Sequence, residues 1–168
     1  NIFGTVNLVK TCLEFEVPSF TLISTDKAVR PTNFMGASKR FSELYCQAYS
    51  NSNNKTKISI VRFGNVFDSS GSVIPLFREQ IEKGGPITLT HKKMQRYFMT
   101  ISEAVELVIQ SSSMAKGGEI FVLDMGKPIN ILDIAQKMSR LNGLHPTFKK
   151  ASSSSLESQI QIKITGLR

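Results

Sequence analysis

The sequence contains no tryptophan, only two cysteines and only two histidines. Cys12 and Cys46 stand far apart and lack the CxxC or Cys–His spacing of zinc sites, so they predict buried, unpaired thiols rather than metal ligands or a disulfide. His91 and His145 have no partner at a spacing typical of a metal site or a catalytic triad, and we expect both at the surface. The sequence therefore predicts no metal site.

Long apolar runs are also missing. No stretch approaches the roughly 18 apolar residues of a membrane-spanning helix, and no signal peptide opens the chain. The hydrophobic fraction of 40% and charged fraction of 20% are typical of a soluble globular protein and exclude a disordered or collagen-like chain. The 168 residues suffice for one domain, but both ends read as cut. We therefore expect residues 1–168 to be a fragment of a longer protein.

Acidic residues are scarce relative to basic ones. There are 21 Lys and Arg against 13 Asp and Glu, which gives a net charge of +8. The basic residues are scattered, and no helix-turn-helix, zinc-finger or RNP pattern accompanies them, so nucleic-acid binding is not predicted. Anionic small substrates such as nucleoside diphosphates explain a positive site equally well.

Apolar periodicity predicts helices that alternate with short strands. This alternation is typical of an α/β fold with a largely parallel sheet. Ser102 is the expected N-cap of its helix, and Asn142-Gly143 is a helix-ending signal. The polar stretches 51–55 and 152–155 are expected loops. The predicted helices are 5–16, 33–50 (with Phe34, Ala37, Phe41, Leu44, Tyr45 and Ala48 on one side), 73–83, 102–114 and 129–141, and the strands are 20–23, 57–63, 87–90, 119–123 and 159–165.

The glycine-rich phosphate turn of a dinucleotide-binding fold is absent, because neither GxGxxG nor GxxGxxG occurs. If the fold is of the Rossmann type, its first half lies upstream of Asn1. In a parallel sheet the ligand lies beyond the carboxyl ends of the strands, and three segments are expected near that edge.

Each of the three segments has a chemical and a plain structural interpretation. Ser24–Lys27 offers a hydroxyl, a carboxylate and an amine for acid–base work, or else a turn with a solvated ion pair. Met35–Lys39 places two side chains four residues apart on one helix face, or else holds a buried methionine and an exposed lysine. The small residues after Val61–Val66 let a diphosphate approach the backbone, or else form an ordinary strand-to-helix loop.

Taken in order along the chain, these and further segments resemble the extended short-chain dehydrogenase/reductase superfamily, and within it the CapD-like nucleotide-sugar 4,6-dehydratases of polysaccharide biosynthesis. The similar segments are Ser24–Asn33, Met35–Arg40, Val61–Asn65, Ser69–Phe77, Arg96–Thr100, Gly118–Gly126 and Thr165–Arg168. The resemblance implies the C-terminal half of a Rossmann-like fold, with flanking helices and part of a smaller α/β substrate-binding region. Residues 1–66 would complete the NAD-binding domain and carry the active-site helix. Residues 67–168 would bind the nucleotide sugar, interleaved with the last sheet strands.

Two departures from the superfamily pattern stand out. Met35 occupies the position of the usual catalytic tyrosine, which is similar to the large, membrane-anchored branch of this dehydratase group. That branch implies an upstream anchor in the inner membrane, with the present residues on the cytoplasmic side. Phe67-Asp68 stands where a small or aliphatic residue followed by glycine is expected, beside the presumed phosphate loop.

The resemblance implies a redox-neutral reaction with NAD as cofactor and a UDP-sugar, UDP-GlcNAc foremost, as substrate. The product would be a UDP-4-keto-6-deoxy sugar for bacterial glycans such as capsule or lipopolysaccharide. Thr25 would bond the C4 oxygen, Asp26 would protonate the departing C6 hydroxyl, and Lys27 would be the base at C5. The implied binding residues are Lys39, Phe63 and Gly64 for the cofactor, and Asn65, Ser72 and Arg96 for the substrate, while Met35 and Lys39 complete the catalytic group.

Two other functions stay open: a nucleotide-sugar 4-epimerase of the same superfamily, and a non-catalytic nucleotide-sugar-binding domain. An epimerase would carry tyrosine at position 35 and would not need Asp26 and Lys27 together. We expect residues 1–168 alone to bind NAD poorly and to be inactive. In the parent protein we expect a homo-oligomer, with Phe3, Phe41 and Tyr45 as candidate contacts.

Overall fold

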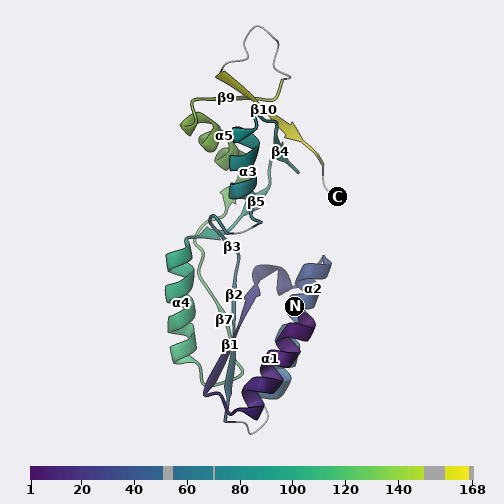
Figure 1. The fold of residues 1–168 in the computed structure, drawn as a ribbon, viewed down its shortest axis with the longest axis vertical. Coiled ribbons are helices and arrows are strands. Elements are labelled where there is room, and N and C mark those ends of the chain that lie inside the picture. Colours follow the sequence, from purple (N-terminus) through teal and green to yellow (C-terminus); the bar gives the residue numbers. More distant parts are fainter. Residues whose placement is uncertain (51–54, 70, 150–157, 167–168) are drawn as a thin grey trace. The chain divides into compact units, whose positions relative to one another are not determined.

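The computed structural model describes residues 1–50, 55–69, 71–149 and 158–166. The chain divides into two compact units (Figure 1). The first unit combines residues 1–64 with 102–125, and the second combines 65–101 with the described part of 126–168. Residues 102–125 pack with the first unit and include β-strand residues 120–122 of its sheet. The sequence-based division had residues 67–168 interleaved with the last sheet strands.

Both units are built from helices and strands, as predicted. The helices are α1 (Ile2–Glu14), α2 (Phe34–Ser50), α3 (Val73–Glu82), α4 (Ile101–Met114) and α5 (Ile131–Leu141), with a 3-10 turn η1 (Asp26–Ala28). The strands are β1 (Ser19–Thr25), β2 (Lys57–Phe63), β3 (Asn65–Val66), β4 (Ile87–Leu89), β5 (Gln95–Arg96), β6 (Phe98–Met99), β7 (Ile120–Val122), β8 (Ile129–Asn130), β9 (His145–Thr147) and β10 (Gln159–Ile164).

The first unit is a parallel sheet of order β1-β2-β7. β2 lies in the middle, and its residues Ile58, Ser59, Ile60 and Val61 are all buried, as expected for a strand covered on both faces. The register pairs Thr25 at the end of β1 with Phe63 at the end of β2. The carboxyl ends of these two strands therefore lie side by side.

Helices cover the two faces of this sheet (Figure 1). Leu22 packs in a core cluster with Val9 of α1 and Cys46 of α2. The preceding residue, Thr21, points to the other face, where its hydroxyl bonds the hydroxyls of Ser59 (3.0 Å) and of Ser112 on α4 (2.9 Å). Because successive strand side chains alternate between faces, α1 and α2 lie on one side and α4 on the other.

The buried face of α2 is the opposite of what its apolar pattern suggests. Most of the apolar residues predicted to share one side are exposed: Phe34 (96% exposed), Ala37, Phe41, Leu44 and Ala48. The face that packs into the unit carries Gly36, Ser42, Glu43 and Cys46 instead. Small residues allow the helix to approach closely, and the buried Glu43 is satisfied by the contacts described below. Amphipathic periodicity alone therefore does not identify the side of this helix that packs into the unit.

The second unit has its own core around a parallel sheet of order β4-β10-β9. Phe77 of α3, Ile87 of β4 and Ile160 of β10 are fully buried in it together with residues of α5. The predicted turn before β4 is confirmed, since Gly84 and Gly85 have φ of 80° and 91°, conformations that favour glycine. Two small sheets, parallel β3-β6 and antiparallel β5-β8, complete the unit.

The sequence-based boundaries need several corrections. α4 begins at Ile101, so Ser102 lies in its first turn and is not the N-cap. Residues 129–130 form a strand before α5, whose cap is the Asn130 side chain, which accepts the Leu132 N–H. The predicted end of α5 at Asn142-Gly143 is confirmed, with Gly143 at φ 73°. The strands of two or three residues in the second unit are too short for periodicity to reveal, except β4.

The predicted burial of the two cysteines and the predicted exposure of the two histidines are confirmed in part. Cys46 is fully buried, and burial, with a contribution from the Glu43 carboxylate, raises the pKa of its thiol to about 11. Cys12 is only half-buried, contrary to prediction. His91 and His145 are both exposed, as predicted. Residues 51–54 and 152–155 of the predicted loops lie outside the described residues. No helix in the described ranges has both the length and the apolarity needed to cross a bilayer.

Candidate functional site

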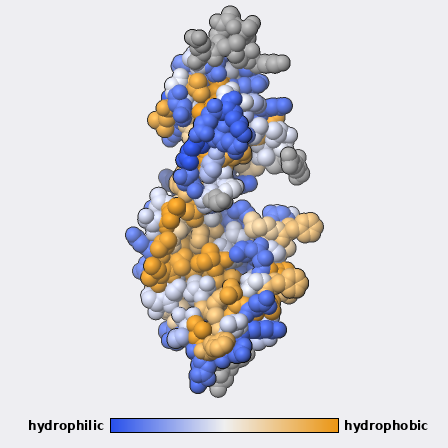
Figure 2. All heavy atoms as spheres, in the orientation of Figure 1, coloured by the Kyte–Doolittle hydropathy of each residue, from blue (hydrophilic) through white to orange (hydrophobic). Residues whose placement is uncertain are grey.

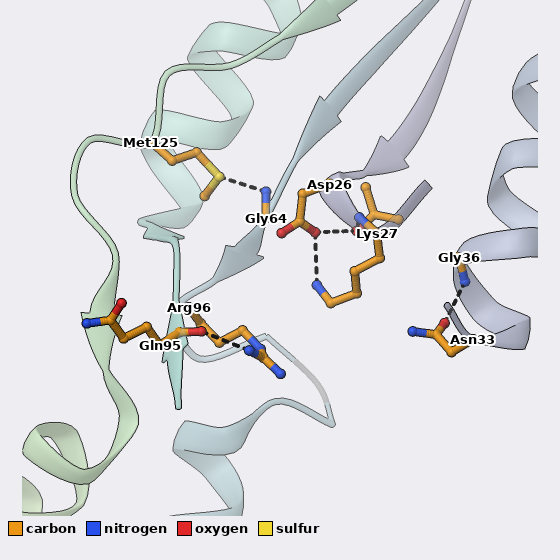
Figure 3. Close-up of polar contacts among 9 residues, drawn as sticks. Asp26, Lys27, Asn33, Gly36, Gly64, Gln95, Arg96 and Met125 are labelled. Atoms are coloured by element: carbon orange, nitrogen blue, oxygen red, sulfur yellow. Dashed lines mark hydrogen bonds and ion pairs between the residues drawn. The ribbon is translucent and has the colours of Figure 1, made fainter. Parts of the chain in front are cut away.

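The segment Thr25–Lys27 forms a hydrogen-bonded triplet at the carboxyl end of β1 (Figure 3). The Thr25 hydroxyl donates to Asp26 Oδ1 at 2.9 Å, and the Lys27 ammonium donates to the same oxygen at 3.0 Å. Thr25 Oγ1 also accepts the Lys27 backbone N–H at 3.3 Å and so caps the 3-10 turn. The Asp26 and Lys27 side chains are 42% and 29% exposed, which leaves both reachable from solvent.

The beginning of α2 packs directly against this turn. Asn33 caps the helix, because its Oδ1 accepts the Gly36 N–H at 2.8 Å (Figure 3). A Cβ at Gly36 would lie 2.3 Å from the Lys27 carbonyl oxygen, so only glycine permits this approach. The glycine between Met35 and Lys39 in the sequence is therefore what sets the spacing between α2 and the Lys27 turn.

Met35 and Lys39 lie on α2 with different surroundings. The Lys39 ammonium donates to the Ile23 carbonyl oxygen at 2.9 Å, which ties the helix to β1 two residues before Thr25. Met35 is 45% exposed, and its thioether offers neither a titratable proton nor a strong acceptor. The Lys39 amine is thus held near the carboxyl end of β1, whereas Met35 has no group that could transfer a proton.

The carboxyl end of β2 supplies Phe63 and Gly64. Phe63 is the register partner of Thr25. The Gly64 N–H donates to the Met125 sulfur at 2.7 Å (Figure 3), and Met125 belongs to the same unit. Within the first unit, the structure therefore gathers the residues predicted for catalysis and for the cofactor around the carboxyl ends of two adjacent parallel strands, where ligands of such sheets bind.

The second unit contains a cavity of about 660 Å³ that collects the three predicted substrate-binding residues. Asn65 of β3, Ser72 at the start of α3 and Arg96 of β5 all line it. The remaining lining residues are Gly71, Val73, Leu76, Thr88, Leu89, Thr90, Met94, Phe98, Ile131 and Thr165. A volume of this size is typical of small-molecule sites.

In the part of the chain that the structure describes, Ser72 is the cavity residue whose side chain has an unsatisfied hydrogen-bonding group. It is the N-cap residue of α3, but its hydroxyl makes no capping bond. Within the described residues, Ser72 Oγ is buried without a hydrogen-bond partner. A buried polar atom without a partner is costly, and a ligand oxygen would satisfy it. Arg96 adds a guanidinium, one nitrogen of which donates to the Gln95 carbonyl at 2.8 Å (Figure 3).

Sequence reasoning missed Thr88, Thr90 and Thr165 as cavity residues. Thr88 is the middle residue of β4, Thr90 directly follows this strand, and Thr165 follows β10, its parallel partner. The Thr165 N–H and hydroxyl both donate to the Leu89 carbonyl, at 2.7 and 3.2 Å. The usable signal was the rule that carboxyl ends of parallel strands converge, but the β4–β10 pairing joins segments far apart in the sequence.

The unexpected Phe67-Asp68 pair has a structural explanation. Asp68 adopts φ of 59°, the left-handed region in which glycine is favoured and aspartate is tolerated. Its carboxylate pairs with Arg78 at 3.1 Å, and the Phe67 ring stacks on Phe98 with centroids 4.7 Å apart. The departure from the superfamily pattern therefore keeps the backbone shape that glycine would have given.

Across the described residues, no three His, Cys, Asp or Glu side chains are grouped to hold a metal ion.

Comparison with known proteins agrees with this architecture. The family described as polysaccharide biosynthesis protein matches residues 1–168. The capsular polysaccharide biosynthesis protein CapD of Staphylococcus aureus is 52% identical over the whole chain, and the probable polysaccharide biosynthesis protein EpsC of Bacillus subtilis (strain 168) is 48% identical. The chain spans 26% of the length of each of these two relatives.

Solved structures share the fold. The X-ray structure of Pen from Bacillus thuringiensis is 37% identical, with a TM-score of 0.85 over 99% of this chain and 48% of that one. A dTDP-glucose 4,6-dehydratase from Streptomyces venezuelae, DesIV, solved with NAD, covers 99% of this chain and 57% of its own at 19% identity and a TM-score of 0.77. The latter likeness concerns the fold alone, which is the Rossmann-like α/β arrangement predicted from sequence.

Proposed function

This chain belongs to the family of polysaccharide biosynthesis proteins, and on that premise we propose that it forms part of an NAD-dependent nucleotide-sugar 4,6-dehydratase. The proposed substrate is a UDP-N-acetylhexosamine, UDP-GlcNAc foremost, and the product is a UDP-4-keto-6-deoxy sugar for capsule or related glycans. The observation that carries the proposal is the Thr25–Asp26–Lys27 triplet at the carboxyl end of a parallel strand. It presents a hydroxyl, an acid and an amine at one point.

The residues present fit the nicotinamide half of the cofactor. The Lys39 ammonium and the Thr25 hydroxyl lie at the carboxyl end of β1, and Phe63 and Gly64 follow on β2. An ammonium and a hydroxyl are suitable donors for ribose hydroxyls, and glycine leaves room for a ligand near the backbone. The chemistry that bound NAD supplies is reversible hydride transfer, which leaves the overall reaction redox-neutral.

The chain's own residues divide the elimination of water between them. A ketone at sugar C4 makes the C5 hydrogen acidic, so oxidation at C4 comes before water loss. Thr25 donates a hydrogen bond to the C4 oxygen, and Lys27 removes the C5 proton. Asp26 delivers a proton to the departing C6 hydroxyl. The Lys27 ammonium donates to Asp26 Oδ1 in the structure. The step therefore requires this proton to pass from Lys27 to Asp26, which leaves a neutral amine as the base at C5 and a carboxylic acid as the donor to the C6 hydroxyl.

In other members of the superfamily a tyrosine in the position of Met35 accepts the C4 hydroxyl proton. Met35 cannot do so, and the proton must go to another acceptor. Its thioether has no proton to exchange. Water or Asp26 is the acceptor in this scheme, and Lys39 supplies positive charge nearby.

The second unit is proposed to hold the UDP-sugar. Arg96 offers several N–H donors to diphosphate oxygens, and the unsatisfied Ser72 hydroxyl at the start of α3 adds another donor. Asn65 contributes an amide on the same cavity wall. The apolar residues that line the rest of the cavity would exclude water from the bound nucleotide.

One observation favours a second function, a nucleotide-sugar 4-epimerase. A protein named UDP-glucose 4-epimerase from Rickettsia canadensis is 39% identical over 124 residues, which cover 73% of this chain and 36% of that protein. An epimerase would interconvert sugars without loss of water. Met35 and the Asp26–Lys27 pair favour the dehydratase. The non-catalytic binding domain is the remaining alternative.

The deciding experiment incubates the protein from its complete reading frame with UDP-GlcNAc in heavy water and follows the sugar by mass spectrometry. The dehydratase yields a product that has lost one water and carries deuterium at C5. An isomer of unchanged composition would support the epimerase. Intact UDP-GlcNAc and intact further UDP- and dTDP-sugars would leave the binding domain as the better account.

Self-association is proposed to involve the outer faces of α1 and α2. Phe3 is 84% and Phe41 is 51% exposed, whereas Tyr45 packs against the core cluster and is a poorer contact. Figure 2 shows further hydrophobic surface on the first unit, where α4 exposes Val105, Ile109 and Met114. We also propose that the parent protein places this chain on the cytoplasmic side of the inner membrane, through an anchor outside residues 1–168.

A further inference from the structure

We propose that Glu43 is a positioning residue that holds the three site-bearing segments of the first unit in place. The inference rests on the proposed dehydratase function for its catalytic readout. Glu43 lies on the buried face of α2, and its side chain is 0% exposed. It touches none of the residues assigned to catalysis, so its effect is exerted through its neighbours.

The Glu43 carboxylate receives four hydrogen bonds. Arg62 donates from Nε to Oε1 at 2.7 Å and from Nη2 to Oε2 at 2.5 Å. The Ser24 hydroxyl donates to Oε1 at 2.6 Å, and Arg40 donates from Nη1 to Oε2 at 3.0 Å. Each carboxylate oxygen therefore accepts two bonds, and the Arg62 fork fixes the plane of the carboxylate.

Each donor is the sequence neighbour of a residue assigned to the site. Ser24 directly precedes Thr25 and the catalytic turn. Arg40 follows Lys39 on α2. Arg62 directly precedes Phe63 and Gly64 on β2. One buried carboxylate thus joins the ends of β1 and β2 to α2, which are the three segments that carry the catalytic and cofactor residues of this unit.

The arrangement is better explained by orientation than by stability. A buried ion pair contributes little net stability, because desolvation offsets the attraction, and replacing all of its partners together by apolar side chains of similar volume is often neutral. Directional bonds from three segments, however, restrict their relative positions in a way that apolar packing does not. Misplacement of about 1 Å costs about 100-fold in rate when catalytic groups act together.

The test compares Glu43→Gln and Ser24→Ala in the protein from its complete reading frame. Glu43→Gln keeps the shape but removes the charge, and Ser24→Ala removes one neutral donor if the first variant fails to fold. Glu119→Gln is the matched control, because this carboxylate in the same unit bonds backbone amides of its own turn, at Lys116 and Gly117. Val9→Ala is the control for a general loss of core packing.

Two readouts are measured. Hydrogen exchange of peptides that cover Thr25–Ala28 and Phe63–Gly64 is expected to speed up in both test variants and in neither control. With UDP-GlcNAc, kcat is expected to fall about 10- to 100-fold in Glu43→Gln while KM stays within about threefold, since the substrate residues lie in the second unit. Glu43→Asp, which keeps the charge on a shorter side chain, is expected to recover part of kcat.

Unchanged exchange at both segments, or a kcat loss no larger than that of Val9→Ala, would overturn the inference. If the wild-type protein turns over no UDP-sugar, the proposed function fails instead. The exchange measurement then still decides whether Glu43 orders the two strand ends. The two failures are therefore distinguishable.

Discussion

The two units place their candidate site residues in different surroundings. In the first unit, Thr25, Asp26 and Lys27 bond one another, Lys39 bonds a backbone carbonyl, and Glu43 is saturated by four donors. In the second unit, Asn65, Ser72 and Arg96 line a cavity of about 660 Å³. The candidate catalytic groups are thus held by bonds within the first unit, whereas the candidate binding groups line an open volume in the second. This contrast is typical of a division between chemistry and binding.

The largest expected effect comes from the catalytic turn. In the proposed mechanism, Asp26→Asn removes the acid that protonates the C6 hydroxyl and weakens the contact with Lys27, so kcat should fall about 100- to 10,000-fold. UDP binding, measured by titration calorimetry, should change by less than about threefold. Equal losses in kcat and in UDP affinity would break the proposed division between the units.

The close approach at Gly36 should give the next largest effect. Gly36→Ala places a Cβ 2.3 Å from the Lys27 carbonyl oxygen, so the helix or the turn must move. We expect the free energy of unfolding in urea to fall by about 1–3 kcal/mol, and kcat to fall as well.

Gly4→Ala on α1 is the control for Gly36→Ala. Nothing lies within 4 Å of its Cβ position. Alanine is favoured over glycine by about 0.8–1 kcal/mol in a helix interior, and by less in the first turn of α1, where Gly4 lies. Gly4→Ala should therefore stabilise the protein. If both alanines stabilise, α2 does not depend on the contact with Lys27.

A substitution in the second unit should act on binding alone. Arg96→Gln removes a charged donor from the cavity, and loss of such a bond costs about 1.5–3 kcal/mol, or roughly 10- to 100-fold in affinity. KM for the UDP-sugar should rise accordingly while kcat changes little. Arg140→Gln, at an exposed position of the same unit outside the cavity, should leave both unchanged. A fall in kcat without a change in KM would assign Arg96 to the chemistry instead.

Acid should remove the stabilising contribution of Glu43. Burial raises the pKa of this carboxyl, but the hydrogen bonds from Arg62, Ser24 and Arg40 and the Arg62 charge outweigh it and hold the pKa below its usual value. A carboxyl with a lowered folded-state pKa contributes stability above its unfolded pKa, near 4.3, and loses it as pH falls through the folded-state value. The difference in unfolding free energy between wild type and Glu43→Gln should therefore narrow from pH 7 to pH 3. A constant difference would show that the charge is not involved.

The smallest effect is expected at Asp68. Its φ of 59° favours glycine, so Asp68→Gly should stabilise the second unit by up to about 1 kcal/mol. The exposed pair with Arg78 contributes little, about 0–1 kcal/mol, and Arg78→Met measures that share separately. Thermal unfolding of the three proteins decides the sign. A marked destabilisation by glycine would mean that the Asp68 carboxylate has a structural role of its own.

Local sequence signals predicted much of the fold and of the first-unit site. The Thr25–Lys27 segment follows a strand because a short apolar run ends there, and residues adjacent in the chain meet at that strand end without help from elsewhere. The helix end at Asn142-Gly143 was predictable for the same reason, since a cap depends on a few consecutive residues. The cavity threonines were not, because Thr90 and Thr165 come together only through the pairing of β4 with β10.

The amino-acid sequence by itself determined the α/β alternation, the order of the site segments and the chemistry that each segment carries. Only the tertiary structure decided that α2 packs through Gly36, Ser42 and Glu43 while Phe34 and Phe41 remain exposed. The physical reason is that helical periodicity shows only which residues are apolar. The buried face also depends on the side chains of the strands against which the helix packs. Here they offer the Ser24 hydroxyl and the Arg62 guanidinium, which make a buried glutamate favourable where an apolar residue would leave those donors unsatisfied.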